Sequence, residues 1–504
     1  MSKMIIAHDL GTSGNKATLF TTEGELLASA VYPYEARFSD GNRAEQNPNL
    51  WWKAFCATNK ELLAGRETRG VAAVSFSGQM MGCLCVDKQG IPLRESIIWA
   101  DMRAQKEADE IAAKIDPQRF YCLTGHRNSS SYSAQKLMWV KRNQPDVYRQ
   151  THKMLGAKDY LIHKLTGRFL TEPSDASGTN LFDINTLKWS EELVEAAGLD
   201  PDKLPRVVPS TEVAGEISPT VGEECGLPAG TKVVMGGGDG VCASVGAGSV
   251  TPGVVYNCLG TSSWVSTTTK APILDPQMRT FNFAHIVPGL VNPCGAMQAA
   301  GLSYNWAIQT LYGGELAAAE KNARVYELAN RELAAVPALA GGLVFLPYLI
   351  GERSPRWNPN ARGAFVGLTP EHGRGEMMRS VVEGIALNLR IILDVFRQAE
   401  KIGEVTLIGG LAQGEIIRQI LADVFEADVK MPNRVQEATS IGAAVTAGVG
   451  AGLLKDFSEV SRFAATRRKT APNPENARAY RAFMPVYNRA YNQLIPVFDS
   501  LGGL

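Results

Sequence analysis

Apolar runs typical of strands alternate along this chain with longer segments of helical periodicity. The pattern predicts helices at residues 49–63 and 375–399, each followed by a strand, at residues 71–77 and 404–408. In the second helix the apolar side chains recur every three or four positions and so share one face, at Met377, Val381, Ile385, Leu389, Ile392 and Val395. Helices that alternate with strands indicate an α/β fold.

The chain also contains an internal repeat. The tetrapeptide Leu-Gly-Thr-Ser at residues 10–13 recurs at residues 259–262, and both copies lie between β-type runs, which predicts two hairpins with Gly/Thr/Ser turns. We interpret the repeat as a duplicated core, although turn residues are common enough for four of them to match by chance. A turn with Gly and Pro at residues 247–253 then predicts two domains, residues 1–247 and 248–504.

Composition limits the partners of the chain. Its 504 residues, 45% of them hydrophobic, can form more than one core, and its 51 basic side chains balance 51 acidic ones. A neutral chain lacks the concentrated basic surface that nucleic acid and anionic membranes require, so we expect a small-molecule partner. Eight cysteines without a Cys-x-x-Cys pair and six histidines without a His-Glu-x-x-His motif predict reduced thiols and no dedicated protein-ligated metal.

The sequence does not predict export or insertion into a membrane. The first apolar run is too short for a signal peptide, and the longest apolar stretch, residues 441–454, is shorter than the roughly 20 residues of a transmembrane helix. We therefore expect a cytoplasmic protein.

The first predicted hairpin has the residues of a phosphate-binding loop. Gly11 lets the backbone approach an anion, the hydroxyls of Thr12 and Ser13 can donate hydrogen bonds, and Lys16 adds a positive charge. Asp9, at the end of the preceding strand, can hold the water shell of Mg²⁺. An ordinary hairpin turn has similar residues, but the second copy of the turn favours the phosphate loop.

Two further glycine clusters follow apolar strands. Residues 233–240 place Asp239 where a strand opens into glycines, so that it can accept a proton from a substrate hydroxyl, or bond its own backbone as an ordinary turn aspartate. Gly409 and Gly410 lie between a strand and a predicted helix at residues 415–425. This arrangement suits a bound nucleotide, or else plain packing of the strand against the helix.

Two longer motifs make the chain resemble a known family. Residues 131–143 read Ser-x-Ser-x-x-Lys-Leu-x-Trp-Val-x-Arg-Asn, and residues 363–383 read Gly-x-Phe-x-Gly-Leu, seven residues, then Glu-Met-x-x-Ser-Val-Val-Glu. Shorter segments agree, among them Lys158-Asp159-Tyr160-Leu161. Over nearly its whole length the chain is similar to the FGGY carbohydrate kinases of the actin-like ATPase superfamily, and most of all to their xylulose kinases.

The resemblance implies a fold and an activity. The family has two ribonuclease-H-like domains, with mixed sheets flanked by helices and a central cleft, and it phosphorylates a sugar hydroxyl with ATP and Mg²⁺. By motif match, Asp9 corresponds to the acid near Mg²⁺ and Asp239 to the general base. The match assigns ATP to Gly11, Thr12, Ser13, Lys16, Gly260, Thr261, Ser262, Gly409, Gly410 and Ala412. It assigns the sugar to Gln79, Met80, Met81, Trp99, Asp101, Arg103, Asp239 and Gly240.

The chain departs from the xylulose-kinase pattern at the sugar segments. Met81 stands where xylulose kinases have His, and Gly240 where they have Asn, so two hydrogen bonds to the sugar are absent, each worth roughly 1 to 3 kcal/mol. D-xylulose, phosphorylated at its 5-hydroxyl, is the expected substrate, and ribulose, L-xylulose, gluconate or another polyol remain open. The adenosine motif also differs, since it reads Gly-Gly-Leu-Ala-Gln-Gly.

Each assignment has a plainer alternative. Trp99 can belong to the core, Asp101 and Arg103 can form a solvated turn pair, and Met80 and Met81 can be gap-filling core residues. For the whole chain the rivals are an actin-like nucleotide-binding protein without a sugar pocket, and a kinase relative that binds its ligand without turnover. Family analogy also makes a homodimer plausible.

Overall fold

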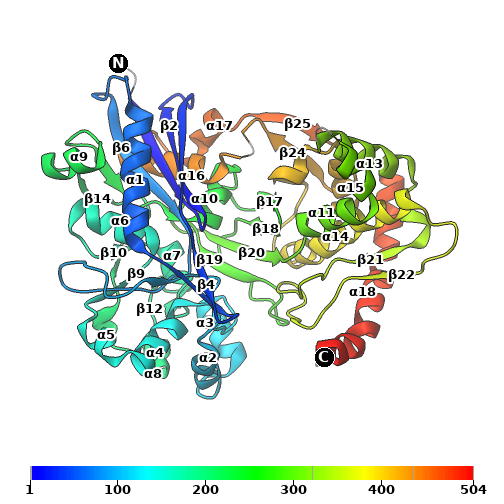
Figure 1. Cartoon of the computed structure of the whole chain (residues 1–504), viewed down its shortest axis with the longest axis horizontal. Helices are drawn as coiled ribbons and strands as arrows, with labels where there is room; N and C mark the ends of the chain where they lie inside the picture. Colours follow the sequence, from blue (N-terminus) through cyan, green and yellow to red (C-terminus); the bar gives the residue numbers. More distant parts are fainter. Residues whose placement is uncertain (1–2, 320–321, 435, 503–504) are drawn as a thin grey trace. The chain divides into compact units, whose positions relative to one another are not determined.

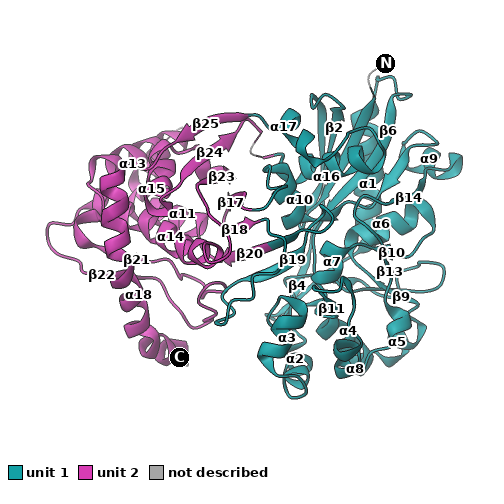
Figure 2. Cartoon of the chain, turned by 180° about the vertical axis from the view of Figure 1, so that it is seen from behind, with its two compact units in different colours: residues 1–252, 268–292, 437–465 teal, residues 253–267, 293–436, 466–504 magenta. Residues whose placement is uncertain are grey.

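The computed structural model describes residues 3–319, 322–434 and 436–502, which form two compact units (Figures 1 and 2). Unit 1 comprises residues 1–252, 268–292 and 437–465, and unit 2 comprises residues 253–267, 293–436 and 466–504. The predicted boundary after residue 247 lies near the first passage between units. Two later segments, residues 268–292 and 437–465, return to unit 1 although the prediction places them in the second domain.

A mixed sheet forms the centre of unit 1. Its strand order is β14 (Val213–Glu216), β15 (Lys232–Val234), β6 (Val71–Gly78), β1 (Met4–Leu10), β2 (Gly14–Thr21) and β3 (Leu26–Pro33), with β16 (Gly237–Gly238) paired to the end of β6. β1, β2 and β3 are antiparallel neighbours, whereas β6 and β15 continue the sheet parallel to β1. The predicted first hairpin is therefore confirmed.

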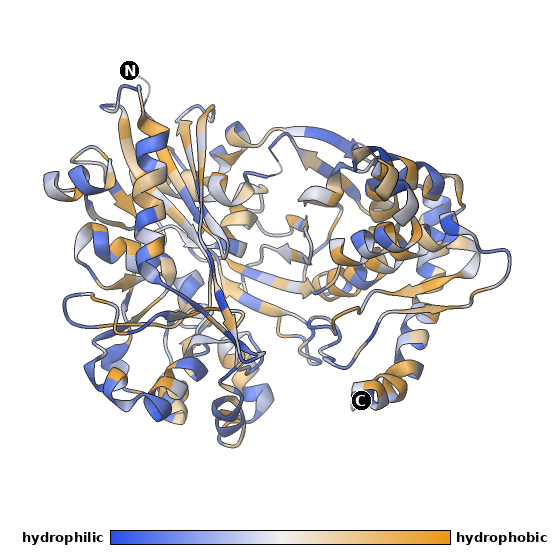
Figure 3. Cartoon of the chain, in the orientation of Figure 1, coloured by the Kyte–Doolittle hydropathy of each residue, from blue (hydrophilic) through white to orange (hydrophobic). Residues whose placement is uncertain are grey.

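The two faces of this sheet bury different helices. On β1, Ile6 and His8 face α1 (Pro48–Leu63), where the rings of His8 and Phe55 lie 4.4 Å apart. Successive strand residues alternate between faces, so Ile5 and Asp9 point the other way, toward α16 (Ala438–Gly450). Figure 3 shows hydrophobic colour along these central strands. Asp9 is the polar end of an otherwise apolar strand face.

Helix α10 (Asp239–Gly246) crosses α16 on that second face with their backbones in close approach. A methyl group at Gly442 would overlap the carbonyl oxygen of Cys242, and one at Gly246 would overlap that of Ala438. Glycine is needed at both positions because neither backbone can retreat without leaving the sheet. The crossing brings the N-terminal ends of both helices to the end of β1.

Unit 2 repeats the sheet of unit 1. The order of this seven-stranded sheet is β19 (Phe281–Ala284), β20 (Val291–Met297), β18 (Ser263–Thr267), β17 (Val255–Leu259), β23 (Glu404–Ile408), β24 (Asp428–Pro432) and β25 (Thr466–Thr470), and its first strand, β19, lies in the chain segment 268–292. β20, β18 and β17 are antiparallel, and β23 and β24 run parallel to β17, as β3, β2, β1, β6 and β15 do in unit 1. The second hairpin and the duplicated core are thus confirmed.

The remaining elements surround these sheets. In unit 1 they are β4 (Arg37–Ser39), β5 (Arg43–Gln46), β7 (Leu84–Val86), β8 (Ser96–Ile97), α2 (Gln105–Ala112), α3 (Pro117–Thr124), α4 (Ser133–Asn143), α5 (Pro145–Gln150), β9 (Lys153–Leu155), α6 (Ala157–Thr166), β10 (Leu170–Thr171), α7 (Pro173–Ser177), β11 (Phe182–Asp183), β12 (Lys188–Trp189), α8 (Glu191–Ala197), β13 (Arg206–Val207), α9 (Pro219–Cys225) and α17 (Val460–Phe463). In unit 2 they are α11 (Gly301–Leu311), α12 (Gly313–Ala318), α13 (Ala323–Ala335), β21 (Val344–Leu346), β22 (Ala364–Val366), α14 (Arg374–Phe396), α15 (Glu415–Phe425) and α18 (Pro474–Gly502). Short 3₁₀ turns complete the list, at η1 (Pro201–Lys203), η2 (Ala340–Gly342), η3 (Gly410–Gln413) and η4 (Phe457–Glu459).

Most predicted elements agree with the structure. α1 and α15 match their predicted ranges to within one residue, and α14 ends at Phe396, three residues before the predicted end. Phe396 is the last buried apolar residue of α14, and the polar residues that follow it have no core to face. Within the described ranges, no helix is long and apolar enough to cross a membrane.

The helix crossing generates a prediction about stability. We expect Gly442→Ala to lower the free energy of unfolding by about 2–3 kcal/mol, because the added methyl group forces the two helices apart. Thermal unfolding monitored by circular dichroism measures the effect. Gly314→Ala, in α12, is the matched control, because a Cβ there meets open space and alanine favours the helix. Equal melting temperatures for Gly442→Ala and the wild type would contradict the proposed tight crossing.

Candidate active site

Asp9 lies at the C-terminal end of β1, where two hydroxyl groups bind its carboxylate. Ser77 Oγ of β6 donates to Oδ1 at 2.9 Å, and Thr439 Oγ1 of α16 donates to Oδ2 at 2.6 Å. Burial raises the pKa of Asp9 above its ordinary value, although both hydrogen bonds oppose the shift. The Asp9 carboxylate is half-buried, and the two hydroxyl groups hold it in one orientation, so that it can serve as an oxygen ligand.

Lys16, the predicted phosphate-binding cation, already has an acidic partner. Its Nζ lies 2.5 Å from Oε2 of Glu437, a residue next to the start of α16 and more than 400 positions away in the chain. No local pattern predicts this pair, because it forms only through the return of residues 437–465 to unit 1. The positive charge at the first turn is therefore largely neutralised by the protein.

Asp239 begins α10 directly after the short strand β16. Its Oδ1 accepts a hydrogen bond from the backbone N–H of Gly240 at 2.7 Å. Burial, followed by the negative charge of Asp9, raises the pKa of Asp239 to about 7. A carboxylate with a pKa near 7 can both take up and release a proton at neutral pH, as a general base must. Asp239 and Asp9 thus lie on one face of the sheet and interact electrostatically.

Side chains from three elements fix the turn between β1 and β2. Tyr34 Oη donates to the Gly11 carbonyl at 2.8 Å, and Gln46 Nε2 donates to the Thr12 carbonyl at 2.6 Å. Trp99 Nε1 donates to Thr12 Oγ1 at 2.8 Å, and Trp99 is 39% exposed, so the reading of Trp99 as a core residue is wrong. The Thr12 hydroxyl proton remains available to an acceptor beyond the turn.

Gln79 follows β6 and carries a buried polar atom that the protein does not satisfy. Its Nε2 donates to Gln46 Oε1 at 2.7 Å, whereas its Oε1 is buried and receives no hydrogen bond from the described part of the chain. A buried acceptor without a donor costs about 1–3 kcal/mol. A ligand hydroxyl at this position would recover that cost.

Met80 and Met81 lie close to the catalytic candidate. A Cβ at Gly238 would overlap the side chain of Met80, so this side chain lies against the backbone just before Asp239. Met81 has a left-handed backbone (φ 61°), and its carbonyl accepts a hydrogen bond from Lys136 Nζ at 2.8 Å. Met80 is only 5% exposed, so its interpretation as a gap-filling core residue stays open.

Asp101 and Arg103 form a buried ion pair. The Asp101 carboxylate is 0% exposed and accepts from the Ala44 backbone N–H at 2.6 Å and from the Arg103 guanidinium at 2.6–2.9 Å. Arg103 also pairs with Glu45 at 2.9 Å and lies over the Trp139 ring. The alternative of a solvated turn pair is wrong. These contacts anchor the loop that carries Trp99. The ion pair therefore supports the candidate site through Trp99.

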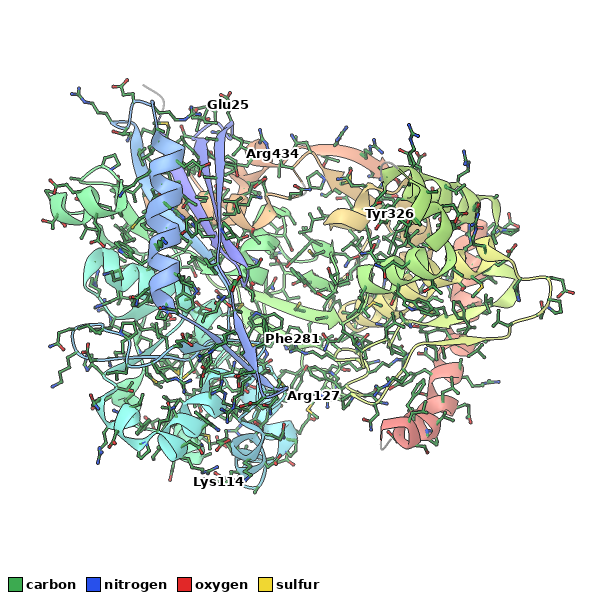
Figure 4. The ribbon with its side chains drawn as sticks, viewed as in Figure 1. Glu25, Lys114, Arg127, Phe281, Tyr326 and Arg434 are labelled. Carbon is green, nitrogen blue, oxygen red and sulfur yellow. The ribbon has the colours of Figure 1, made fainter. Side chains whose placement is uncertain are left out.

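Unit 2 contains a cavity of about 510 Å³ at the second turn. It is lined by Leu259, Gly260, Thr261, Gly301, Tyr304, Asn305, Ala323, Tyr326, Asn330, Gly410, Leu411, Gln413, Gly414 and Ile417. The rings of Tyr304 and Tyr326 stack with 6.0 Å between centroids, and Tyr326 is labelled on α13 in Figure 4. Their hydroxyls donate to Asn330 and Asn305, at 2.9 and 3.1 Å. The volume suits one nucleoside-sized ligand.

The predicted nucleotide residues divide between this cavity and its support. Gly260, Thr261 and Gly410 line it, whereas Ser262, Gly409 and Ala412 are not among its lining residues. Ala412 is the buried residue of η3, and Gly409 has a φ of 92° and lies against the Leu259 carbonyl. The tyrosine and asparagine pairs of α11 and α13 were missed, because a single Tyr or Asn on a helix has no motif. The same holds for Ser77 and Thr439 in unit 1.

Comparisons with known proteins agree over nearly the whole chain. The models of the FGGY family of carbohydrate kinases match residues 4–246 (N-terminal domain) and 255–451 (C-terminal domain). The chain is 32% identical to a xylulose kinase of Escherichia coli (strain K12), with 98% of this chain and 100% of the relative covered. It is 29% identical to a gluconokinase of Bacillus subtilis (strain 168), with 100% and 99% covered. A crystal structure of ligand-bound xylulose kinase from Lactobacillus acidophilus superposes with a TM-score of 0.92 at 29% identity, covering 99% of both chains.

The raised pKa of Asp239 generates a prediction about stability and pH. Because this pKa is about 7 in the folded protein and 3.8 ordinarily, the folded state binds more protons between these values, and the free energy of unfolding falls as pH rises through that window. We expect Asp239→Asn to remove this loss and to raise the free energy of unfolding by about 1–2 kcal/mol at pH 8, with little effect at pH 4. Denaturant unfolding at both pH values measures it.

Asp109→Asn, at an exposed carboxylate of α2, is the control and should leave the free energy of unfolding unchanged at both pH values. A variant Asp239→Asn that is no more stable than the wild type at pH 8 would show that the carboxylate is not destabilised by its surroundings.

Proposed function

Because the chain belongs to the FGGY family of carbohydrate kinases, we propose that it transfers the γ-phosphoryl group of ATP to a hydroxyl of a pentulose, D-xylulose first. The protein is a phosphotransferase with a sugar alcohol group as acceptor. The observation that carries the proposal is the pair of carboxylates at Asp9 and Asp239 on one face of unit 1. Gluconate is the second candidate, since a gluconokinase is nearly as similar to the chain as a xylulose kinase.

In the proposed mechanism Asp239 is the general base. Its carboxylate accepts the proton of the sugar hydroxyl while the oxygen of that hydroxyl forms a bond to the γ-phosphorus and the bond from phosphorus to the β-phosphate oxygen breaks, which releases ADP. With a pKa of about 7, Asp239 is mostly ionised at slightly alkaline pH. We expect the rate to rise with pH up to about this value and then to level off.

Asp9 has the chemistry of a Mg²⁺ ligand. Mg²⁺ commonly binds one or two carboxylates together with substrate phosphates rather than a cage of protein ligands. Asp9 would hold the ion, and Ser77 and Thr439 would hold Asp9. Bound Mg²⁺ supplies positive charge that balances the phosphates.

We assign the nucleotide to the cavity of unit 2. Aromatic side chains and glycine backbone suit the flat base and the sugar of ATP, and the glycines at residues 260 and 410 allow close approach of a phosphate chain. In unit 1 the unsatisfied Gln79 Oε1 supports binding of a sugar hydroxyl, and the available hydroxyl of Thr12 can donate to a phosphate oxygen of ATP. We propose that unit 1 binds the sugar and supplies the base while unit 2 binds ATP.

The proposal also covers the location of the protein and its oligomeric state. The buried cysteines Cys83 and Cys85, close neighbours in the chain, are thiols, which is typical of a reducing compartment and supports a cytoplasmic location. A homodimer rests on family analogy and is tested by measuring the molar mass in solution.

The activity itself is tested by a coupled assay of ADP release with Mg·ATP. We expect D-xylulose to stimulate release most strongly, and D-ribulose, L-xylulose and D-gluconate to do so less. Asp239→Ala should lower kcat by at least about 100-fold while Mg·ATP still binds, because only the proton acceptor is lost. If no sugar or aldonate stimulated the release of ADP, the proposed kinase activity would be excluded. A fully active Asp239→Ala variant would show that Asp239 is not the general base.

The assignment of the nucleotide has its own test. Tyr326→Ala removes the outer ring of the stacked pair, and we expect the dissociation constant for ATP to rise about tenfold, as calorimetry measures it. The KM for the sugar should stay within twofold. Arg324→Ala is the control, because Arg324 is exposed on the same helix and does not line the cavity. Unchanged affinity in Tyr326→Ala would place the nucleotide elsewhere.

A further inference from the structure

The motif Lys158-Asp159 places a fully buried amine in unit 1 that the proposed mechanism does not use. Lys158 Nζ lies 2.7 Å from Asp159 Oδ1, 2.8 Å from Asp175 Oδ2 and 3.3 Å from Glu172 Oε1. Burial lowers the pKa of this amine, but the three carboxylates outweigh that effect and hold its pKa well above the ordinary value. Burying a cluster of charges costs free energy, so well-packed apolar side chains of similar volume would stabilise this region at least as well.

Glu172 connects this cluster to a serine. Its carboxylate caps α7 by accepting from the backbone N–H groups of Ser174 and Asp175, both at 2.9 Å. It also accepts from the hydroxyls of Ser174 and Ser210, both at 2.7 Å. With Lys158 as well, both oxygens of Glu172 are saturated with donors. The orientation of the Ser174 hydroxyl is therefore fixed.

Ser174 in turn binds the backbone next to the general base. Its single hydroxyl proton points to Glu172, so its Oγ is an acceptor, and it accepts from the N–H of Gly238 at 2.9 Å. Gly238 is the N-cap residue of α10, and its peptide bond leads into Asp239. The series of contacts from Lys158 through Glu172 and Ser174 thus ends one residue before the proposed base.

The backbone at this point needs an external anchor. Residues 236–238 are three consecutive glycines, and the strand that they form with β6 contains only two residues. Glycine loses more conformational freedom on folding than any other residue, so this segment holds its position only through contacts with neighbours. Those neighbours are the carbonyl of Phe76, the side chains of Ile286 and Met80, and Ser174. The Ser210 carbonyl accepts from the Gly236 N–H at 3.0 Å, and the Cys242 thiol donates to the Gly237 carbonyl at 3.6 Å. At Gly238 itself, the residue next to the proposed base, the side-chain hydrogen bond comes from Ser174.

We propose that Ser174, held by Glu172 and Lys158, is a positioning residue that fixes the Gly238 amide and thereby aims the Asp239 carboxylate at the substrate hydroxyl. The inference rests on the proposed role of Asp239 as the base. It gives a reason for the buried cluster of Lys158, Asp159, Glu172 and Asp175: Lys158 holds Glu172, and Glu172 orients the Ser174 hydroxyl more firmly than a solvent-exposed group could.

The test compares Ser174→Ala with Ser210→Ala. Both variants remove one buried hydroxyl that donates to Glu172, but only Ser174 contacts Gly238. With Mg·ATP and D-xylulose or D-gluconate, we expect Ser174→Ala to lower kcat at least tenfold with the KM for ATP within twofold. Ser210→Ala should keep kcat within threefold, and Ser174→Thr, which retains the hydroxyl, should recover most of the loss. Equal kcat in the two alanine variants would overturn the proposal.

A second readout does not depend on the substrate. Amide hydrogen exchange, followed by mass spectrometry on peptides that contain Gly238, should be about tenfold faster in Ser174→Ala than in the wild type and unchanged in Ser210→Ala. Unchanged exchange in Ser174→Ala would refute the anchor whatever the sugar is. A wild-type protein that phosphorylates no sugar would refute the proposed function alone, since the exchange result would still decide whether Ser174 holds the amide.

Discussion

The crossing of α10 and α16 is the constraint on which the site in unit 1 depends. Glycines at residues 246 and 442 let the two backbones touch, and only at that distance do both helix starts reach the end of β1. One start carries Asp239, and the other carries Thr439, which binds Asp9. Larger residues at the crossing would separate the two carboxylates from each other and from their hydrogen-bonding partners. The burial that, together with the negative charge of Asp9, raises the pKa of Asp239 to about 7 is thus a product of close packing.

The framework of the fold was predictable from local patterns. Period-two and helical spacing gave the hairpins, α1, α14 and α15, and the repeated turn gave a duplicated core, because these signals come from residues close together in the chain. The shared strand order of the two sheets extends the repeat from four residues to five strands in each unit. The return of residues 268–292 and 437–465 to unit 1 was not predictable, since nothing in their composition indicates that they belong to the first unit.

Residues of the candidate site were predictable from the sequence where their type and local motif indicate their chemistry. They were not predictable where only contacts with distant segments give them a role. Asp9 ends an apolar strand just before a glycine turn, and Asp239 follows a glycine-rich strand; both are local signals, and both residues lie on the same sheet face. Thr439, Glu437 and Tyr326 are ordinary helix or loop residues that acquire a role only through contacts with distant segments. The solvated alternative for Asp101 and Arg103 failed for the same reason, because Asp101 binds the backbone of β5 and Arg103 lies over Trp139.

The late return of the chain to unit 1 affects how the protein is made. The sheet face that carries Ile5 and Asp9 is covered by a helix that begins at residue 438, so a ribosome must synthesise more than 400 residues after β1 before that face can close. Until then the nascent N-terminal half exposes apolar strand surface to its surroundings, a substrate for holding chaperones. For the same reason a fragment cut between residues 247 and 248 would lack the lining of its own core, and the two homologous halves, though alike in topology, are not separable modules.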